Sequence, residues 1–213
     1  MTTSSEPAEL AAGRFGSVIT SVEELRTHYR PPTRLVAEKK LDHLPAWMRV
    51  TIEASRFVFV ATADATGAVT VSPRGGSEGF VVVLDERTLA LPDYPGNNLT
   101  DSLRNIVTNP FAGLIFLVPG RNETIRVDGA AWVVTDATVL DACRRAGGRR
   151  PKCAIVVSVR HAFFHCPASF QRADVWNPES WRADAALDFD EFIRRTLDPA
   201  DWPAWARGET GDG

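Results

Sequence analysis

The chain has 213 residues, of which 44% are hydrophobic and 24% are charged, and its formal net charge at pH 7 is −3. These proportions are typical of a globular protein, and a slightly acidic chain offers no basic field for nucleic acid or anionic lipid. Its three cysteines are too few for the disulfide framework of a small secreted domain. The N-terminus lacks the cationic and apolar stretches of a signal peptide, and no apolar run is long enough to span a bilayer. We therefore expect a cytoplasmic protein with neither nucleic acid nor a membrane as its partner.

The N-terminal part of the chain is predicted to be partly disordered and partly helical. Residues 1–18 are small and polar, so we expect them to be disordered and 19–213 to form a single domain with helical extensions at both ends. Ser21, followed three residues later by a glutamate, has the pattern of a capping box and predicts a helix through Tyr29, where two prolines end it. A second helix is predicted over about 46–54.

The middle of the chain changes to short β-rich runs separated by turn residues. They cover 56–64, 68–73, 80–84, 88–92, 112–119, 124–134 and 152–165. Several are apolar at consecutive positions, which is typical of strands buried on both faces in a small closed barrel that helices or a second subunit cover. Helices are predicted only at 100–108, at 136–146 with Asp136 as a cap, and after Asp188. Because helices do not alternate with strands, the pattern favours a mainly β barrel of six or seven strands with helical decoration.

The stretch Ser72-Pro73-Arg74-Gly75 is the first candidate binding site. A β-run ends in proline, and an arginine and two glycines follow. Glycines allow a ligand to approach the backbone closely, and an arginine offers two donors that match a phosphate group. The alternative is a hairpin corner with a surface arginine.

A second candidate lies between Leu91-Pro92, which end a β-run, and the helix predicted at 100–108. Asn97 and Asn98 stand in this connection. A helix N-terminus with free N–H groups can bind an anion, and the two asparagines would add neutral donors. The alternative is that Asn98 only forms the turn or caps the helix.

Alternation along the run at 124–134 places Thr124, Arg126 and Asp128 on one face. If that face points into a barrel, Arg126 needs either Asp128 or an anionic ligand as its partner. The alternative is an outward face with a salt bridge at the edge of the sheet.

His161, His165 and Cys166 raise the question of a metal site. The two histidines share a strand face and the cysteine follows directly. A tetrahedral zinc site needs further ligands, and the sequence has no second His or Cys pair to complete the shell. We therefore predict no metal.

Taken in order, four segments resemble the pyridoxamine 5′-phosphate oxidase-like flavoproteins with the FMN-binding split-barrel fold. The segments are 59–76, 89–110, 113–133 and 165–178. The resemblance implies a six-stranded split β-barrel that binds FMN, and a homodimer with its two cofactor sites at the subunit interface.

The resemblance also implies which residues bind the cofactor. They are Ser72, Pro73, Arg74 and Gly75 facing the flavin and its phosphate, Leu91 and Pro92 along the flavin, Asn97 and Asn98 at the phosphate, Thr124 at the isoalloxazine edge, and Arg172 and Trp176 in a C-terminal segment that closes over the flavin. The chain departs from the family where an Arg-Lys pair is usual, at Asn97 and Asn98, and where a lysine is usual, at Ser77. Three cations are thus missing, and Arg74, Arg104 and the helix dipole must compensate for them.

The predicted function is that of an FMN-dependent oxidoreductase acting on a small molecule. Thr124 and Arg126 are candidates to stabilise charge on the reduced flavin, and no general acid or base is assigned. Vitamin B6 oxidation is disfavoured, because the residues that bind that substrate in the family's oxidases have no clear match. The alternatives are a non-catalytic module that binds a flavin, a deazaflavin or haem, and a dimeric structural relic with an empty cleft.

Overall fold

The computed structural model of the chain describes residues 14–94, 98–144, 148, 150–182 and 188–202. The strands are β1 (Phe57–Ala63), β2 (Val69–Gly75), β3 (Val82–Asp85), β4 (Thr88–Asp93), β5 (Phe111–Leu117), β6 (Thr124–Val134) and β7 (Cys153–His165). The helices are α2 (Val22–His28), α3 (Arg34–Glu38), α4 (Ala46–Ala54), α5 (Asp101–Thr108), α6 (Ala137–Ala142), α7 (Ala168–Ala173) and α8 (Phe189–Thr196), with short 3-10 turns at Pro178–Ser180 and Pro199–Asp201.

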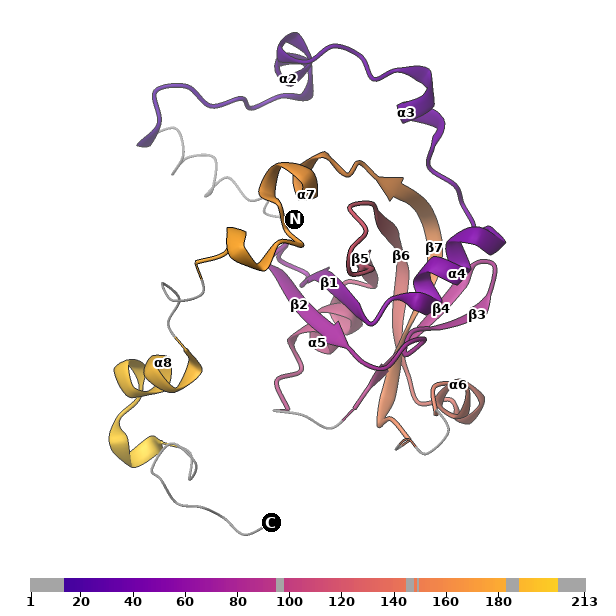
Figure 1. Cartoon of the computed structure of the whole chain (residues 1–213), viewed down its shortest axis with the longest axis vertical. Helices are drawn as coiled ribbons and strands as arrows, with labels where there is room; N and C mark the ends of the chain where they lie inside the picture. The colour runs from indigo at the N-terminus through magenta and orange to yellow at the C-terminus, as the bar shows by residue number, and fades with distance from the viewer. Residues whose placement is uncertain (1–13, 95–97, 145–147, 149, 183–187, 203–213) are drawn as a thin grey trace.

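The seven strands form one antiparallel sheet in the order β2-β1-β5-β6-β7-β4-β3. The sheet curls around a core, as Figure 1 shows, and β2 and β3 remain its two edges. The prediction of a mainly β fold with helical decoration is confirmed. The sheet has seven strands rather than six, because the short strand β3 pairs with β4 at one edge, and it is an open sheet rather than a closed barrel.

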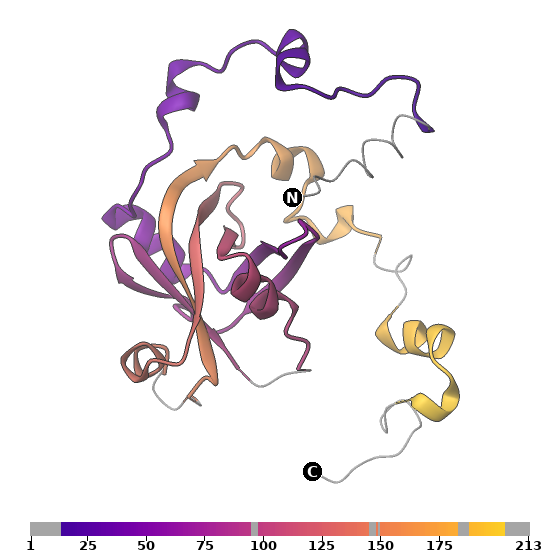
Figure 2. The same cartoon turned by 180° about the vertical axis from the view of Figure 1, so that it is seen from behind.

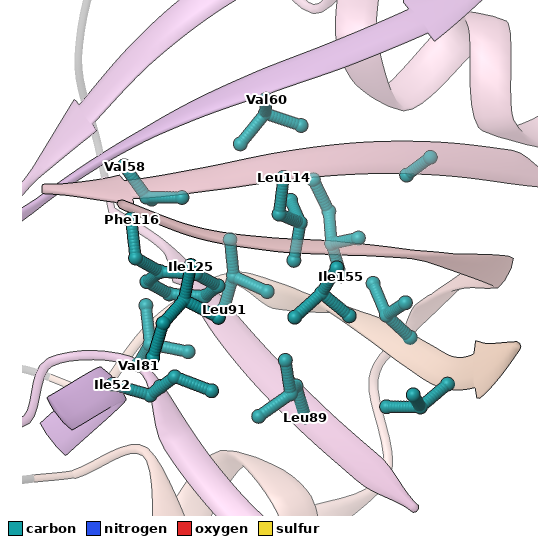
Figure 3. Close-up of a cluster of buried hydrophobic side chains, with 14 of the residues drawn as sticks. Ile52, Val58, Val60, Val81, Leu89, Leu91, Leu114, Phe116, Ile125 and Ile155 are labelled. Atoms are coloured by element: carbon teal, nitrogen blue, oxygen red, sulfur yellow. The ribbon is translucent and has the colours of Figure 1, made fainter. Parts of the chain in front are cut away.

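The core lies on the inner face of the curled sheet, where side chains from β1, β4, β5, β6 and β7 meet Ile52 of α4 (Figure 3). Along β1, Val58 and Val60 are buried and Phe59 between them is exposed; Ile115 of β5 is likewise exposed between two buried residues. Consecutive positions are buried in the centre of β4, where Leu89, Ala90 and Leu91 have no exposed face, as predicted. The outer face of β1 and β5 carries apolar side chains that the described residues leave exposed, and the expected cover by a second subunit stays a prediction there.

A bulge in β6 explains why position 129 is a glycine. The register between β6 and β7 shifts between Asp128 and Gly129. A Cβ atom at Gly129 would overlap the carbonyl oxygen of Ser158 on the neighbouring strand, so only glycine allows the two backbones to approach this closely.

Local capping patterns decide where several helices begin. The backbone N–H of Glu24 donates to Ser21 Oγ over 3.0 Å, and Asp136 and Asp188 accept from the first turns of α6 and α8 in the same way. These three predicted helix starts are confirmed, whereas the short helix α3 was not predicted. No helix in the described ranges is long and apolar enough to cross a membrane.

Candidate functional site

A cavity of about 410 Å³ lies between β2 and the beginning of α5. It is lined by Thr70, Val71, Ser72, Pro73, Arg74, Leu99, Asp101 and Ser102. Strand β2 does not end in the predicted corner but continues through Arg74 to Gly75, which pairs with Phe57. Since Arg74 pairs with the buried Val58, both side chains lie on the inner side of the sheet.

Arg74 is held by the carboxylate of Asp93, which lies on β4 near the opposite edge of the sheet. Its Nη1 atom donates to Asp93 Oδ1 over 2.8 Å, and both side chains are largely buried. The Nε atom of Arg74 is also buried, and it has no acceptor among the described residues. A buried donor without an acceptor is unfavourable, so this arginine is suited to receive an oxygen of an anionic ligand.

The N-terminus of α5 forms another wall of the same cavity. Thr100 is the N-cap residue, but its side chain makes no capping hydrogen bond, and Ser102 in the first turn is buried at the cavity. The first N–H groups of the helix therefore remain donors for an anion. The carboxylate of Asp101 lies in the same turn and opposes that anion, so the site carries acidic as well as basic groups.

A buried polar network fixes α5 to β1 and β2. The side-chain amide of Asn105 donates to Thr62 Oγ1 and to Thr70 Oγ1, each over 3.1 Å, and the two hydroxyl oxygens are themselves 3.1 Å apart. Hydrogen bonds in a buried, fully paired network are strong and directional. Asn105 thus sets the position of the helix whose first turn borders the cavity.

A second cavity of about 390 Å³ continues from the first past Thr70 and Asp101. Arg104 lines this second cavity and not the one around Arg74, and its exposed guanidinium is 4.0 Å from Asp101. Arg104 was expected to compensate for the missing cations, but the carboxylate of Asp101, which lines both cavities, lies between its cavity and that of Arg74.

The connection between β4 and α5 is only partly described. Asn97 lies outside the described residues, whereas Asn98 is exposed and takes the left-handed conformation with φ of 59°, which asparagine tolerates better than most residues. Asn98 is not among the residues that line the Arg74 cavity. Leu91 belongs to the hydrophobic core, and Pro92 pairs with Ala154 of β7.

The polar residues of β6 do not share one environment. Thr124 is buried, whereas Arg126 is exposed and its guanidinium lies 5.8 Å from the ring centre of Phe163. Asp128 does not pair with Arg126 but accepts a hydrogen bond at 2.9 Å from Nδ1 of His161. Arg126 points outward, as the alternative interpretation had it, but β6 lies between β5 and β7 rather than at the edge of the sheet.

Of the two C-terminal residues implied by the resemblance, Trp176 contacts the loop between β5 and β6. The indole Nε1 of Trp176 donates to the carbonyl oxygen of Arg121 over 2.9 Å, and its ring packs against Phe170. Arg172 is exposed on α7. Of the eleven site residues implied by the resemblance, the structure brings three together at the cavity, namely Ser72, Pro73 and Arg74.

One other titratable group, the thiol of Cys153, lies close to Arg74 and Asp93. Burial, with a further contribution from Asp93, raises the pKa of the Cys153 thiol, while Arg74 and Lys152 lower it. Among the described residues, no three His, Cys, Asp or Glu side chains gather where they could hold a metal ion.

Sequence reasoning missed Asp93 and Asn105, the two side chains that position Arg74 and α5. Asp93 follows directly after the Leu91-Pro92 pair, but nothing in the local pattern indicates that it reaches across to β2. Asn105 was detectable as a polar residue on the apolar face of a short amphipathic helix, a position that usually requires buried partners.

The open antiparallel sheet, with a cavity beside its edge strand β2, has the architecture of a split barrel. A family model described as pyridoxamine 5′-phosphate oxidase matches residues 44–166, more than half of the chain. The chain therefore belongs to the pyridoxamine 5′-phosphate oxidase-like family of split-barrel proteins. No curated protein compared with the chain matches it.

Three solved structures with a similar fold illustrate the range of proteins that this chain resembles. HupZ of Group A Streptococcus is 23% identical, with a TM-score of 0.47, and the match covers 56% of this chain and 92% of HupZ. An FMN-binding protein of Syntrophomonas wolfei is 10% identical, with a TM-score of 0.41, and the match covers 55% of this chain and 83% of that one. An FAD binding protein of Mycobacterium smegmatis is 15% identical, with a TM-score of 0.40, and the match covers 59% of this chain and 97% of that one.

Proposed function

We propose that the protein is a cytoplasmic FMN-dependent oxidoreductase that acts on a small molecule. The observation that carries the proposal is the buried Nε of Arg74, which has no acceptor among the described residues and belongs to a side chain lining a 410 Å³ cavity. A ligand phosphate that accepts from this atom would satisfy the buried donor, and a charge-assisted hydrogen bond of this kind is stronger than a neutral one. Family membership supports a flavin as the molecule that carries the phosphate.

The residues around Arg74 fit a phosphate, although the carboxylates of Asp93 and Asp101 offset the positive charge of Arg74. The first turn of α5 offers backbone donors, and Asn97 and Asn98 are proposed to add neutral ones from the preceding connection. Asp93 already neutralises Arg74 in part. Affinity must therefore come from several weak donors in one place, since the described residues that line the cavity include no cation besides Arg74.

The remaining residues implied by the resemblance stay proposals. Gly75, Leu91 and Pro92 would lie along the flavin, and Thr124 and Arg126 would stabilise negative charge near its ring. Arg172 and Trp176 would cover the site from the C-terminal segment. When bound, a flavin supplies hydride transfer. The protein supplies the position of the ring and the exclusion of water around it.

We further propose a homodimer with its cofactor sites at the interface. The outer face of β1, β2 and β5 carries exposed apolar side chains, including Phe59, Val71 and Ile115. These side chains lie on neighbouring strands of one surface: Phe59 of β1 pairs with Ile115 of β5, and Ala61 of β1 pairs with Val71 of β2. Contiguous apolar surface of this kind is typical of interfaces between subunits. Light scattering of the purified protein is expected to give twice the chain mass, and a monomer at micromolar concentration would contradict this part of the proposal.

The absorption spectrum of the purified protein tests the proposed function. A flavin gives absorption bands in the visible range, whereas haem and deazaflavins give different spectra. We expect FMN to be present or to bind after reconstitution, and NADPH or a coupled reductant to bleach its spectrum. Binding without turnover of any electron donor would indicate a carrier module. No colour, together with no stabilisation of the fold by FMN, would indicate an empty relic and would overturn the proposal.

A further inference from the structure

Two arms of the chain stand clear of the sheet in both views of the molecule (Figures 1 and 2). We define the N-arm as residues 14–38, which contain α2 and α3, and the C-arm as residues 188–202, which contain α8. Neither α2 nor α3 has a buried residue, and the N-arm exposes the apolar side chains of Val22, Leu25 and Leu35. In the C-arm, Phe192 and Leu197 are exposed while Ile193 is buried.

Helices of this length need a partner in order to be stable. The helix α2 has 7 residues and α3 has 5, whereas an isolated helix in water is marginal below about 12–15 residues. In proteins, such helices are stabilised by packing of an apolar face. The exposed side chains of Val22 and Leu25, three positions apart on α2, form such a face.

The two arms carry opposite net charges. The N-arm has four basic and three acidic residues, a formal net charge of +1, and the C-arm has two basic and five acidic residues, a net charge of −3. Opposite charges favour the encounter of two surfaces and determine which surfaces meet. The partner of each arm should therefore combine apolar side chains with the opposite charge, and the other arm has both properties.

The arms of one chain are held apart from each other. The N-arm leads into α4, which packs beside the core, and crosses above the sheet, whereas the C-arm follows α7 and lies beside the sheet, well below the N-arm, in both views. A second copy of the chain can present a C-arm to the N-arm without moving either from its own sheet. The uncovered outer face of β1, β2 and β5 would meet the same second copy, so the arms would extend that interface.

We propose that the arms are exchanged between two copies of this chain, with each N-arm lying along the partner's C-arm. The partner is a second copy of this chain, and the contact combines the apolar face of α2 with that of α8, flanked by basic residues on one arm and acidic residues on the other. This inference rests on the proposed homodimer but does not depend on flavin binding.

Cross-linking in a mixed-isotope sample tests the exchange on the full chain. Chains grown in ordinary and in ¹⁵N-labelled medium are unfolded together, refolded and treated with a reagent that joins amines to carboxylates. The substitutions Arg26→Lys and Arg30→Lys place amines on the N-arm and keep its charge. We expect N-arm to C-arm cross-links in which the two peptides carry different isotopes, in about half of the linked pairs.

Two results would overturn the exchange. Arm-to-arm cross-links that always join peptides of one isotope would show that each N-arm lies on its own C-arm, and a lack of arm-to-arm cross-links would show that the arms have other partners.

A variant provides an independent measurement. Val22→Asp together with Leu25→Asp should weaken dimerisation at least tenfold by light scattering over a dilution series. The matched control is Val107→Asp, which changes an equally exposed valine on α5. Equal dimerisation of the arm variant and the control would contradict the proposal. The flavin spectrum of each variant reports the proposed function separately.

Discussion

Arg74 Nη1 lies 2.8 Å from Asp93 Oδ1, and this ion pair joins β2, one edge of the sheet, to β4, next to the other edge. The two strands have no hydrogen-bonded register with each other, so these side chains link parts of the sheet that the backbone leaves open. The same pair controls the charge of the candidate site. Asp93 holds the guanidinium in place and at the same time brings a negative charge close to the proposed phosphate.

The substitution Asp93→Asn is expected to tighten FMN binding. The amide oxygen can still accept from Arg74 Nη1, so the guanidinium keeps its position while a negative charge beside the ligand is removed. At an effective dielectric constant of about 20, removing one such repulsion is worth roughly 1 kcal/mol or more, which corresponds to about fivefold tighter binding. Titration of the apoprotein with FMN, followed by quenching of flavin fluorescence, measures the change. Weaker binding would mean that the carboxylate is required to orient Arg74.

The position of α5 is expected to depend on Asn105. The substitution Asn105→Ala removes two buried hydrogen bonds, to Thr62 and to Thr70, and should lower the free energy of unfolding by about 1–3 kcal/mol. Urea denaturation of the apoprotein measures the loss. The matched control is Thr108→Ala on the same helix, whose hydroxyl donates only to carbonyl oxygens within α5. Equal stability of the two variants would show that the network does not fix the helix.

Trp176 is expected to anchor the C-terminal segment to the loop between β5 and β6. The substitution Trp176→Phe keeps a ring beside Phe170 but removes the hydrogen bond to the carbonyl of Arg121, so it should cost about 1 kcal/mol of stability. The substitution Trp176→Ala also removes the ring contact and should cost more, although less than the roughly 3–5 kcal/mol of a fully buried tryptophan.

FMN binding distinguishes the two roles of this tryptophan. If the segment also covers the flavin, both Trp176 variants bind FMN more weakly than the wild type, and Trp176→Ala is the weaker of the two. A large drop in melting temperature with unchanged FMN affinity would assign Trp176 to packing alone.

The thiol of Cys153 is expected to react slowly with iodoacetamide in the folded protein. Burial and Asp93 raise its pKa, so at a given pH below that value less of the reactive thiolate is present than in the unfolded chain. Reactivity should appear only as the pH rises through the raised pKa, and the difference from exposed Cys166 should vanish in denaturant. Mass spectrometry of the labelled peptides follows both sites. Equal rates for Cys153 and Cys166 in the folded protein at pH 8 would contradict the burial of Cys153.

Local patterns were sufficient to predict most elements of the fold. Ser21, Asp136 and Asp188 were expected to begin helices, and each accepts a backbone hydrogen bond in the first turn. The strands were recognisable because β-branched and apolar residues stand between turn residues. Both faces of β4 are buried as predicted, whereas β1 and β5 expose one apolar face, because apolar composition alone does not show whether the same chain or a second subunit covers that face.

The candidate site was predictable only in part. Arg74 was detectable from its place beside proline and glycine, since that combination indicates a close approach of a ligand to the backbone. Asp93 was not detectable, because its contact with Arg74 depends on how the sheet curls and on the order of its strands. Neither property can be predicted from a local sequence pattern. Thr124 and Arg126 alternate correctly along β6, but their different burial depends on the segments that pack outside the strand.

The most direct test of a phosphate site at Arg74 is FMN titration of three apoproteins: the wild type, Arg74→Ala and Asn98→Ala. Hydrogen bonds to charged groups contribute about 1.5–3 kcal/mol and neutral ones about 1 kcal/mol. Arg74→Ala should therefore weaken binding by roughly 10-fold to 150-fold, and Asn98→Ala by about fivefold. The control Arg104→Ala removes a cation that lines the neighbouring cavity and should have the smallest effect. Equal losses for Arg74→Ala and Asn98→Ala, or no loss for Arg74→Ala, would show that this arginine does not bind the phosphate.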